Sequence, residues 1–201
     1  MKKNQIAYAC FTDEMLNVLR EMKGKTFKSY EYDATDKFDH ATFRLRLNLG
    51  TFAIDLSNEL HMLPLWGRDE PDAIVDEIAY FKCEKAKLSD PFPYGIETKA
   101  YMVDERIKAV RVIRNEIYIE KFDFTVIMDY ALIIETRWHT YAFSREVSFG
   151  DDITIAMDSI AKVFTNEQVI ADWSDDESAP DYDGEPGEGW IAATTRQIIE
   201  L

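Results

Sequence analysis

The chain has 201 residues, of which 46% are hydrophobic and 13% aromatic, so it has enough apolar material for a folded core. Its formal net charge is −15, and residues 151–201 carry 13 acidic groups against 2 basic groups. This excess of acids disfavours direct binding to nucleic acid or to anionic lipid, because phosphate groups are bound by Lys and Arg.

Signals for export, membrane insertion and metal binding are missing from the sequence. Cys10 and Cys83 lie far apart, and with three scattered histidines they do not form the four-ligand cluster of a structural zinc site. The apolar run near the N-terminus is too short for a signal peptide, and the apolar stretch 124–134 is interrupted by Asp129. We therefore expect a soluble, cytoplasmic protein that has no membrane contact, no metal and no cofactor.

The first predicted helix covers residues 11–25. Its apolar residues recur at helical spacing, Thr12 can cap the first turn, and Gly24 can end the helix in a left-handed conformation. Residues 26–34 then alternate with period two, which predicts a strand with one partly aromatic face.

Residues 41–56 contain the clearest strand pattern in the chain. Every second residue from 43 to 49 is Phe or Leu, which predicts one buried face. Arg44 and Arg46 fall on the other face, and we expect them to be solvated rather than to form a binding stripe. Gly50 permits a turn or bulge before the apolar pattern resumes.

The pattern of residues 67–87 fits two structures. Pro71 suits the first turn of a helix, and acids precede lysines as the helix dipole favours, so we predict a helix at the start. Residues 78–84 also alternate, and there both helix and strand stay open. The segment 88–95 contains Pro and Gly, and predicts a loop and a candidate subdomain boundary.

At least four β-rich runs follow between residues 100 and 149, with predicted turns at Asp104-Glu105 and Arg114-Asn115. Because these runs follow one another without a helix between them, the expected class is α+β. We predict a single domain, residues 1–201, with a mostly antiparallel sheet that could close partly into a barrel and a few packed helices.

Two helices and a strand are predicted near the C-terminus. Residues 153–164 have apolar side chains at helical spacing, and Asp152 can cap them. A second, short helix is predicted to begin at Asn166, and residues 191–201 are predicted to form a closing strand that rejoins the main sheet.

A hairpin about residues 129–131 would gather polar side chains on one face of the sheet. Its pairing places mostly apolar residues on the opposite face, which supports this register. The polar face would hold the candidate catalytic residues Asp123, Glu135, Arg137 and His139 as acid, base and anion clamp. A solvated face with cross-strand ion pairs is the simpler interpretation. Because the connecting residues lack Gly, one long continuous strand is an alternative.

The segment 172–190 holds eight carboxylates and no Lys or Arg. We predict that 174–189 form a solvated, weakly packed loop held at Trp173 and Trp190, because these residues contain no Ile, Leu, Val, Phe or Met. A docking surface for a basic protein and a weak cation site are the alternatives. The docking surface would use the acidic residues Asp172, Asp175, Asp176, Glu177, Asp181, Asp183, Glu185 and Glu188.

No complete catalytic or metal-binding motif occurs in the sequence. The acidic stretch matches part of a calcium-binding loop, but Ala179 and Trp190 stand where the first ligand and the bidentate Glu are needed. We therefore expect a non-enzymatic binding or regulatory protein whose acidic C-terminal region suits a basic protein partner. The alternative function is a small hydrolase that uses the polar sheet face around Glu135 and His139.

Overall fold

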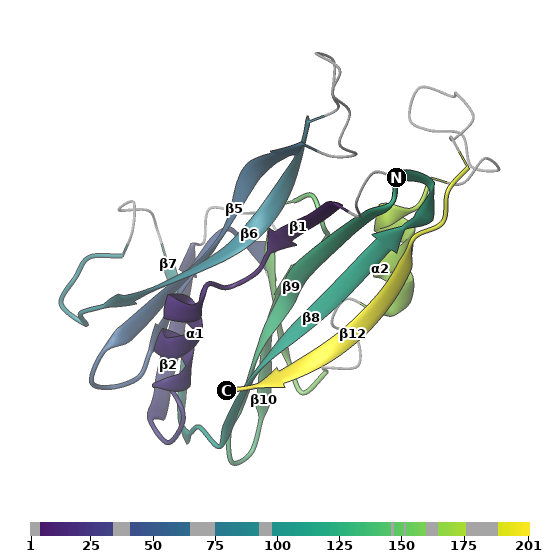
Figure 1. Cartoon of the computed structure of the whole chain (residues 1–201). Helices are drawn as coiled ribbons and strands as arrows, with labels where there is room; N and C mark the ends of the chain where they lie inside the picture. Colours follow the sequence, from purple (N-terminus) through teal and green to yellow (C-terminus); the bar gives the residue numbers. More distant parts are fainter. Residues whose placement is uncertain are drawn as a thin grey trace.

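Two β-sheets that share a core make up most of the structure (Figure 1). This computed structural model describes residues 5–33, 41–64, 75–92, 98–145, 147–150, 152–159, 165–175 and 189–201. The five-stranded sheet has the order β6-β5-β4-β2-β7 and contains β2 (Thr26–Asp33), β4 (Arg44–Asn48), β5 (Ala53–Pro64), β6 (Val75–Ala86) and β7 (Thr98–Arg106). The seven-stranded sheet contains β1 (Gln5–Ala9), β3 (Ala41–Thr42), β8 (Ala109–Ile119), β9 (Phe124–Glu135), β10 (Thr140–Arg145), β11 (Ile153–Met157) and β12 (Ala193–Glu200).

The strand pairing confirms the predicted sheet-dominated, mostly antiparallel fold. Only β1 and β9 pair in parallel among the described strands. The described helices are α1 (Asp13–Arg20), α2 (Asn166–Trp173) and the short 3₁₀ helix η1 (Glu120–Phe122). The described strands form two separate hydrogen-bonded networks, so the predicted partial closure into a barrel is not confirmed.

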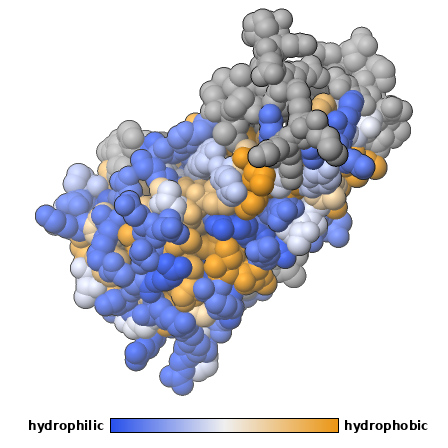
Figure 2. All heavy atoms as spheres, in the orientation of Figure 1, coloured by the Kyte–Doolittle hydropathy of each residue, from blue (hydrophilic) through white to orange (hydrophobic). Residues whose placement is uncertain are grey.

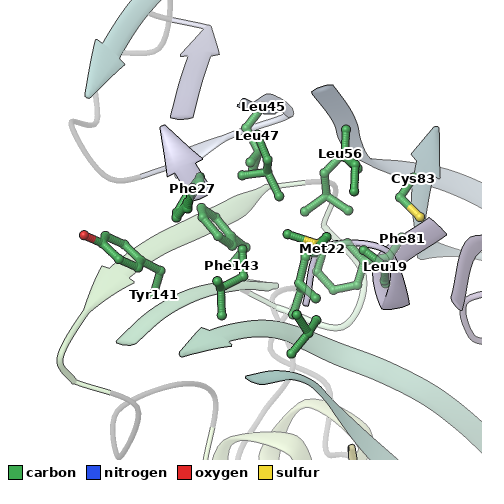
Figure 3. Close-up of a cluster of buried hydrophobic side chains, with 14 of the residues drawn as sticks. Leu19, Met22, Phe27, Leu45, Leu47, Leu56, Phe81, Cys83, Tyr141 and Phe143 are labelled. Carbon is green, nitrogen blue, oxygen red and sulfur yellow. The ribbon is translucent and has the colours of Figure 1, made fainter. Parts of the chain in front are cut away.

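The main hydrophobic core lies between the two sheets (Figure 3). Its labelled side chains come from α1 and the turn after it, from four strands of the five-stranded sheet and from β10: Leu19, Met22, Phe27, Leu45, Leu47, Leu56, Phe81, Cys83, Tyr141 and Phe143. Burial of each large apolar side chain stabilises the fold by roughly 1.5–3 kcal/mol. A second cluster, which includes Val169 and Trp173 of α2, covers the other face of the seven-stranded sheet. The central strand β9 is therefore buried on both faces.

The local signals around α1 are confirmed. The Thr12 side chain accepts a hydrogen bond from the Met15 N–H, and Leu16 and Leu19 are buried. Gly24 has a φ of +79°, a left-handed conformation that favours glycine, and it ends the turn before β2. The predicted start of α2 at Asn166 and the closing strand β12, which pairs with β8, are confirmed as well.

Two predicted helices are strands in the structure. Val75–Ala86 form β6, which pairs with β5 along its whole length, so the helix is wrong from residue 75 onward; Pro71 lies outside the described residues. Ile153–Met157 form β11, paired with β10, and residues 160–164 lie outside the described part. Both segments carry apolar residues that fit either period, and pairing with a neighbouring strand satisfies the backbone groups of the extended form.

The predicted turns at Asp104-Glu105 and Arg114-Asn115 lie inside the continuous strands β7 and β8. Asp104 has a positive φ of 56°, and the register of β7 with β2 shifts nearby between Phe27 and Ser29. In β8 the register with β9 shifts between Ile113 and Arg114. These irregularities bend paired strands without reversing the chain.

Arg46 is buried, with 7% of its surface exposed, so its predicted place on a solvated face is wrong. Its guanidinium donates to both carboxylate oxygens of Asp55 at 2.6 and 2.8 Å, and to the backbone carbonyls of Asp90 and Pro91. The predicted loop that begins at residue 88 therefore covers this side chain through residue 92, and residues 93–95 lie outside the described part. The next strand, β7, still belongs to the five-stranded sheet.

Candidate functional site

The predicted hairpin about residues 129–131 is wrong, and the alternative of one continuous strand is confirmed. β9 runs without interruption from Phe124 to Glu135. The register shift opposite Ile113 and Arg114 leaves Tyr130 as an extra residue, so the side chains change face there without a turn. Asp123 and Glu135 therefore lie at opposite ends of β9, about 40 Å apart at about 3.3 Å per residue.

Both carboxylates, Asp123 and Glu135, are held by side chains of β8: Tyr118 for Asp123 and Arg111 for Glu135. Asp123 accepts a hydrogen bond from the Tyr118 hydroxyl at 3.3 Å. Glu135 forms an ion pair with Arg111 at 2.8 Å, and Arg111 also pairs with Glu200 of β12. Glu135 thus cross-links neighbouring strands, as the simpler interpretation of a solvated face expects.

His139 lies between two carboxylates that the sequence did not associate with it. Its Nδ1 lies 2.7 Å from Asp158 Oδ2, and its Nε2 lies 3.7 Å from Glu105 Oε1. The hydrogen bond to Asp158 raises the pKa of His139, with smaller contributions from the two negative charges. The contact with Asp158 depends on β11 being a strand beside β10, which the predicted helix concealed.

Arg137, the fourth predicted residue, lines a hollow of about 500 Å³ that we name the cationic hollow. Its lining residues are Lys23, Gly24, Arg106, Ile107, Lys108 and Arg137. They belong to the turn after α1, the β7–β8 connection and the β9–β10 connection, which meet at the lower end of the molecule in Figure 1. Figure 2 shows that this end carries hydrophilic side chains, whereas an apolar area lies between α1 and β12.

Backbone hydrogen bonds hold the three segments of the cationic hollow together. The Gly24 N–H donates to the Ile107 carbonyl at 3.1 Å, and the Ile107 N–H donates to the Lys25 carbonyl at 2.9 Å. The Lys108 N–H donates to the Glu135 carbonyl at 2.8 Å. These bonds fix the positions from which the four cationic side chains extend.

Three of the four cations of the hollow, Arg106, Lys108 and Arg137, have no ionic partner in the part of the chain that the structure describes, whereas Lys23 faces the terminal residue Leu201. No Asp or Glu of this part lies within 4.0 Å of Lys23, Arg106, Lys108 or Arg137. Lys23 Nζ donates at 3.3 Å to an oxygen of the terminal carboxylate of Leu201. Uncharged groups position two of the other cations: Lys108 Nζ donates to the Arg137 carbonyl at 3.3 Å, and the Arg137 guanidinium lies 4.6 Å from the Trp138 ring centroid. The positive charge of these two side chains is therefore not neutralised by the described residues.

A second, smaller hollow of about 130 Å³ on the five-stranded sheet differs in its electrostatics. Lys82, which lines it, forms ion pairs with Glu59 at 3.6 Å and with Glu84 at 3.2 Å. Asp55, also in the lining, pairs with Arg46. Because these opposite charges are already matched, this hollow attracts an ionic ligand less than the cationic hollow does.

The two thiols lie in surroundings that suppress nucleophilic chemistry. Burial, with a further contribution from Asp129, raises the pKa of Cys10 to about 12. Burial and the Glu84 charge raise the pKa of Cys83 to about 12. Since the thiolate is the nucleophile, neither cysteine is activated near neutral pH. Among the described residues, no group of three or more His, Cys, Asp or Glu side chains is placed to hold a metal ion.

The two ends of the acidic stretch are fixed to the protein, as predicted. Trp173 is buried, and its carbonyl accepts a hydrogen bond from Trp190 Nε1 at 3.0 Å. Asp175 and Trp190 form an antiparallel bridge, and the Asp172 carboxylate accepts the Ser148 N–H at 2.8 Å. The other predicted interaction residues lie outside the described part: Asp176, Glu177, Asp181, Asp183, Glu185 and Glu188.

The sequence matches no protein-family model, and comparisons with curated proteins and with solved structures give no significant match. Neither α1 nor α2 has the length and apolar composition of a membrane span. The function is therefore argued from the geometry of the sites alone.

Proposed function

We propose that this chain is a non-enzymatic binding protein that takes an anionic ligand in the cationic hollow. The observation that carries this proposal is the set of four cations around one hollow, of which Arg106, Lys108 and Arg137 have no ionic partner among the described residues. Like charges brought together repel one another, and a bound anion relieves this repulsion. In a chain with a net charge of −15, carboxylates are abundant, yet the residues that line this hollow include neither Asp nor Glu.

The placement of the other polar groups supports binding over catalysis. Asp123 lies far from the other three candidates of the hydrolase alternative, and Glu135 and His139 are held by different partners: Arg111 for Glu135, Asp158 and Glu105 for His139. General acid–base catalysis needs its groups within hydrogen-bond reach of one reacting atom. The hydrolase stays a weaker proposal because Arg137 is the one candidate of the four in the lining of the cationic hollow.

The acidic stretch is a second proposed surface, suited to a basic protein partner. The anchoring of its ends at Trp173 and Trp190 supports this proposal, because a fixed base reduces the entropy that a docking segment loses on binding. A cytoplasmic location also stays a proposal.

Titration calorimetry with sulfate, citrate and tripolyphosphate at low ionic strength tests the anion site. We expect at least one of these anions to bind with one-to-one stoichiometry and to raise the melting temperature. The double variant Arg106→Gln/Arg137→Gln should lose this binding. The control Lys87→Gln/Lys121→Gln, which removes the same charge from exposed residues outside the hollow, should retain it. Binding of none of the anions, or equal loss in both double variants, would refute the proposal.

A further inference from the structure

We infer that the ligand of the cationic hollow is a small molecule that carries two or more phosphate groups. This inference rests on the proposed anion-binding function and names the class of anion. It follows from the number of the cations, from how they are held and from the size of the hollow.

The number of cations exceeds what one oxyanion group can use. Arg106, Lys108 and Arg137 supply three positive charges beside Lys23, which faces the terminal carboxylate of Leu201, whereas a phosphate monoester carries about −1.5 to −2 near neutral pH. A single phosphate would thus leave about one of the three positive charges without a partner. Two linked phosphates would match them.

The way in which the cations are held favours a ligand that spans the hollow. Arg106 ends β7 of the five-stranded sheet, whereas Arg137 follows β9 of the seven-stranded sheet. Lys108 donates to the Arg137 carbonyl at 3.3 Å, which fixes its direction without neutralising it. Guanidinium groups bind phosphate through two parallel hydrogen bonds, so two arginines in separate segments suit two phosphate groups.

The size of the hollow exceeds a single ion. Its volume of about 500 Å³ lies in the range of roughly 300–1,000 Å³ that is usual for sites of small organic ligands. Gly24 lines the hollow without a side chain, and its φ of +79° disfavours other residues there. The Trp138 side chain, 69% exposed, lies beside Arg137 and offers a ring for the apolar part of a phosphorylated molecule.

Calorimetric affinities for phosphate, pyrophosphate and tripolyphosphate test the inference, with citrate as a carboxylate of charge similar to pyrophosphate. We expect the affinity to rise about tenfold or more with each added phosphate, because each engages cations that the previous one left unpaired. Pyrophosphate should also bind about tenfold or more tightly than citrate.

Single variants test independently whether the ligand contacts several of the cations at once. Lys108→Gln and Arg137→Gln should each weaken tripolyphosphate binding more than phosphate binding, because a single phosphate can use the remaining cations. The control Lys87→Gln should change neither affinity.

Two results would overturn the inference and leave the anion site in place: equal affinities for phosphate and tripolyphosphate, or citrate binding as tight as pyrophosphate binding. Preference for an acidic peptide over every phosphate would overturn it in favour of a protein ligand. If no anion binds at all, the proposed function fails together with the inference.

Discussion

Replacement of Asp129 by Ala should destabilise the fold by about 4 kcal/mol. Among the described residues, its carboxylate is the only anion in a buried junction that it forms with Phe11, Arg114 and Arg145. Its side chain is fully buried and accepts three hydrogen bonds: from the Phe11 N–H at 2.7 Å and from Arg114 Nε and Nη2 at 2.6 and 2.9 Å. A second cation, Arg145, is buried beside it and donates to the Asp129 backbone carbonyl. The burial of Arg145 lowers its pKa to about 10, which shows how unfavourable its charge already is there.

The magnitude follows from what the truncation leaves behind. An unpaired buried N–H, that of Phe11, costs about 1–3 kcal/mol, and the loss of one partner from a buried ion pair costs about 3–5 kcal/mol. Arg114 keeps 23% of its side chain exposed, so water restores part of its solvation and the sum falls near 4 kcal/mol. This is a large share of a total stability of roughly 5–15 kcal/mol.

Urea unfolding measures the effect as a shift of the midpoint at an unchanged slope. Asp129→Asn, which keeps an acceptor for Phe11, should lose about half as much. The double variant Asp129→Ala/Arg114→Met should recover part of the loss, because it removes the cation that the single variant leaves without a counter-charge. A loss below about 1 kcal/mol in Asp129→Ala would show that water or neighbouring groups replace the carboxylate, and would refute this account of the junction.

Three further measurements test other parts of the structure. Both cysteine thiols should react with a thiol reagent only slowly at about pH 8 and rapidly in denaturant, because burial raises the pKa of each to about 12; rapid native labelling would contradict this. The pKa of His139, measured by NMR, should exceed 6.5 and fall in Asp158→Asn, because Asp158 stabilises the protonated ring. The contact should stabilise the fold below about pH 6.5, and this stability should be lost as the pH rises through the raised pKa of His139. It should also be lost in strong acid, where Asp158 is protonated, because the Thr140 N–H and His139 lower the pKa of Asp158 below 3.8. Trp173→Phe should cost about 2 kcal/mol, since the indole N–H donates to Ser148 Oγ at 2.9 Å, whereas Trp138→Phe at the exposed position should cost less than about 0.5 kcal/mol; equal effects would refute the anchoring role.

The parts of the fold that local signals determine could be predicted from the sequence. The start of α1 depends on Thr12, whose side chain accepts the Met15 N–H, and the turn that leads to β2 depends on the positive φ of Gly24; both signals are local. The same holds for the start of α2, where Thr165 caps the helix and Gln168 completes the capping box.

The parts that failed depend on neighbours distant in the chain. Arg46 alternates with buried leucines as a solvated residue should, yet the carbonyls of Asp90 and Pro91 cover it from a loop 44 residues away. β6 and β11 have ambiguous periods, and pairing with β5 and β10 decides them. The cationic hollow could not be predicted, because its cations lie at the end of β7 and in three connections, and these segments meet only through the packing of both sheets.

The net charge of the chain is a poor guide to this site, because the charges are segregated. β12 lies between the acidic stretch and the cationic hollow. The bridge of Asp175 and Trp190 lies before the first residue of β12, and Leu201, which Lys23 contacts, follows its last residue. Eight strand residues span about 27 Å, more than twice the screening length of about 10 Å at 0.1 M salt. An anion bound in the hollow therefore experiences the local cations and little of the acidic residues Asp172 and Asp175 near the other end of β12. A polyanion long enough to reach these two residues would be repelled there, so the same charge distribution that disfavours nucleic acid is compatible with a small phosphorylated ligand.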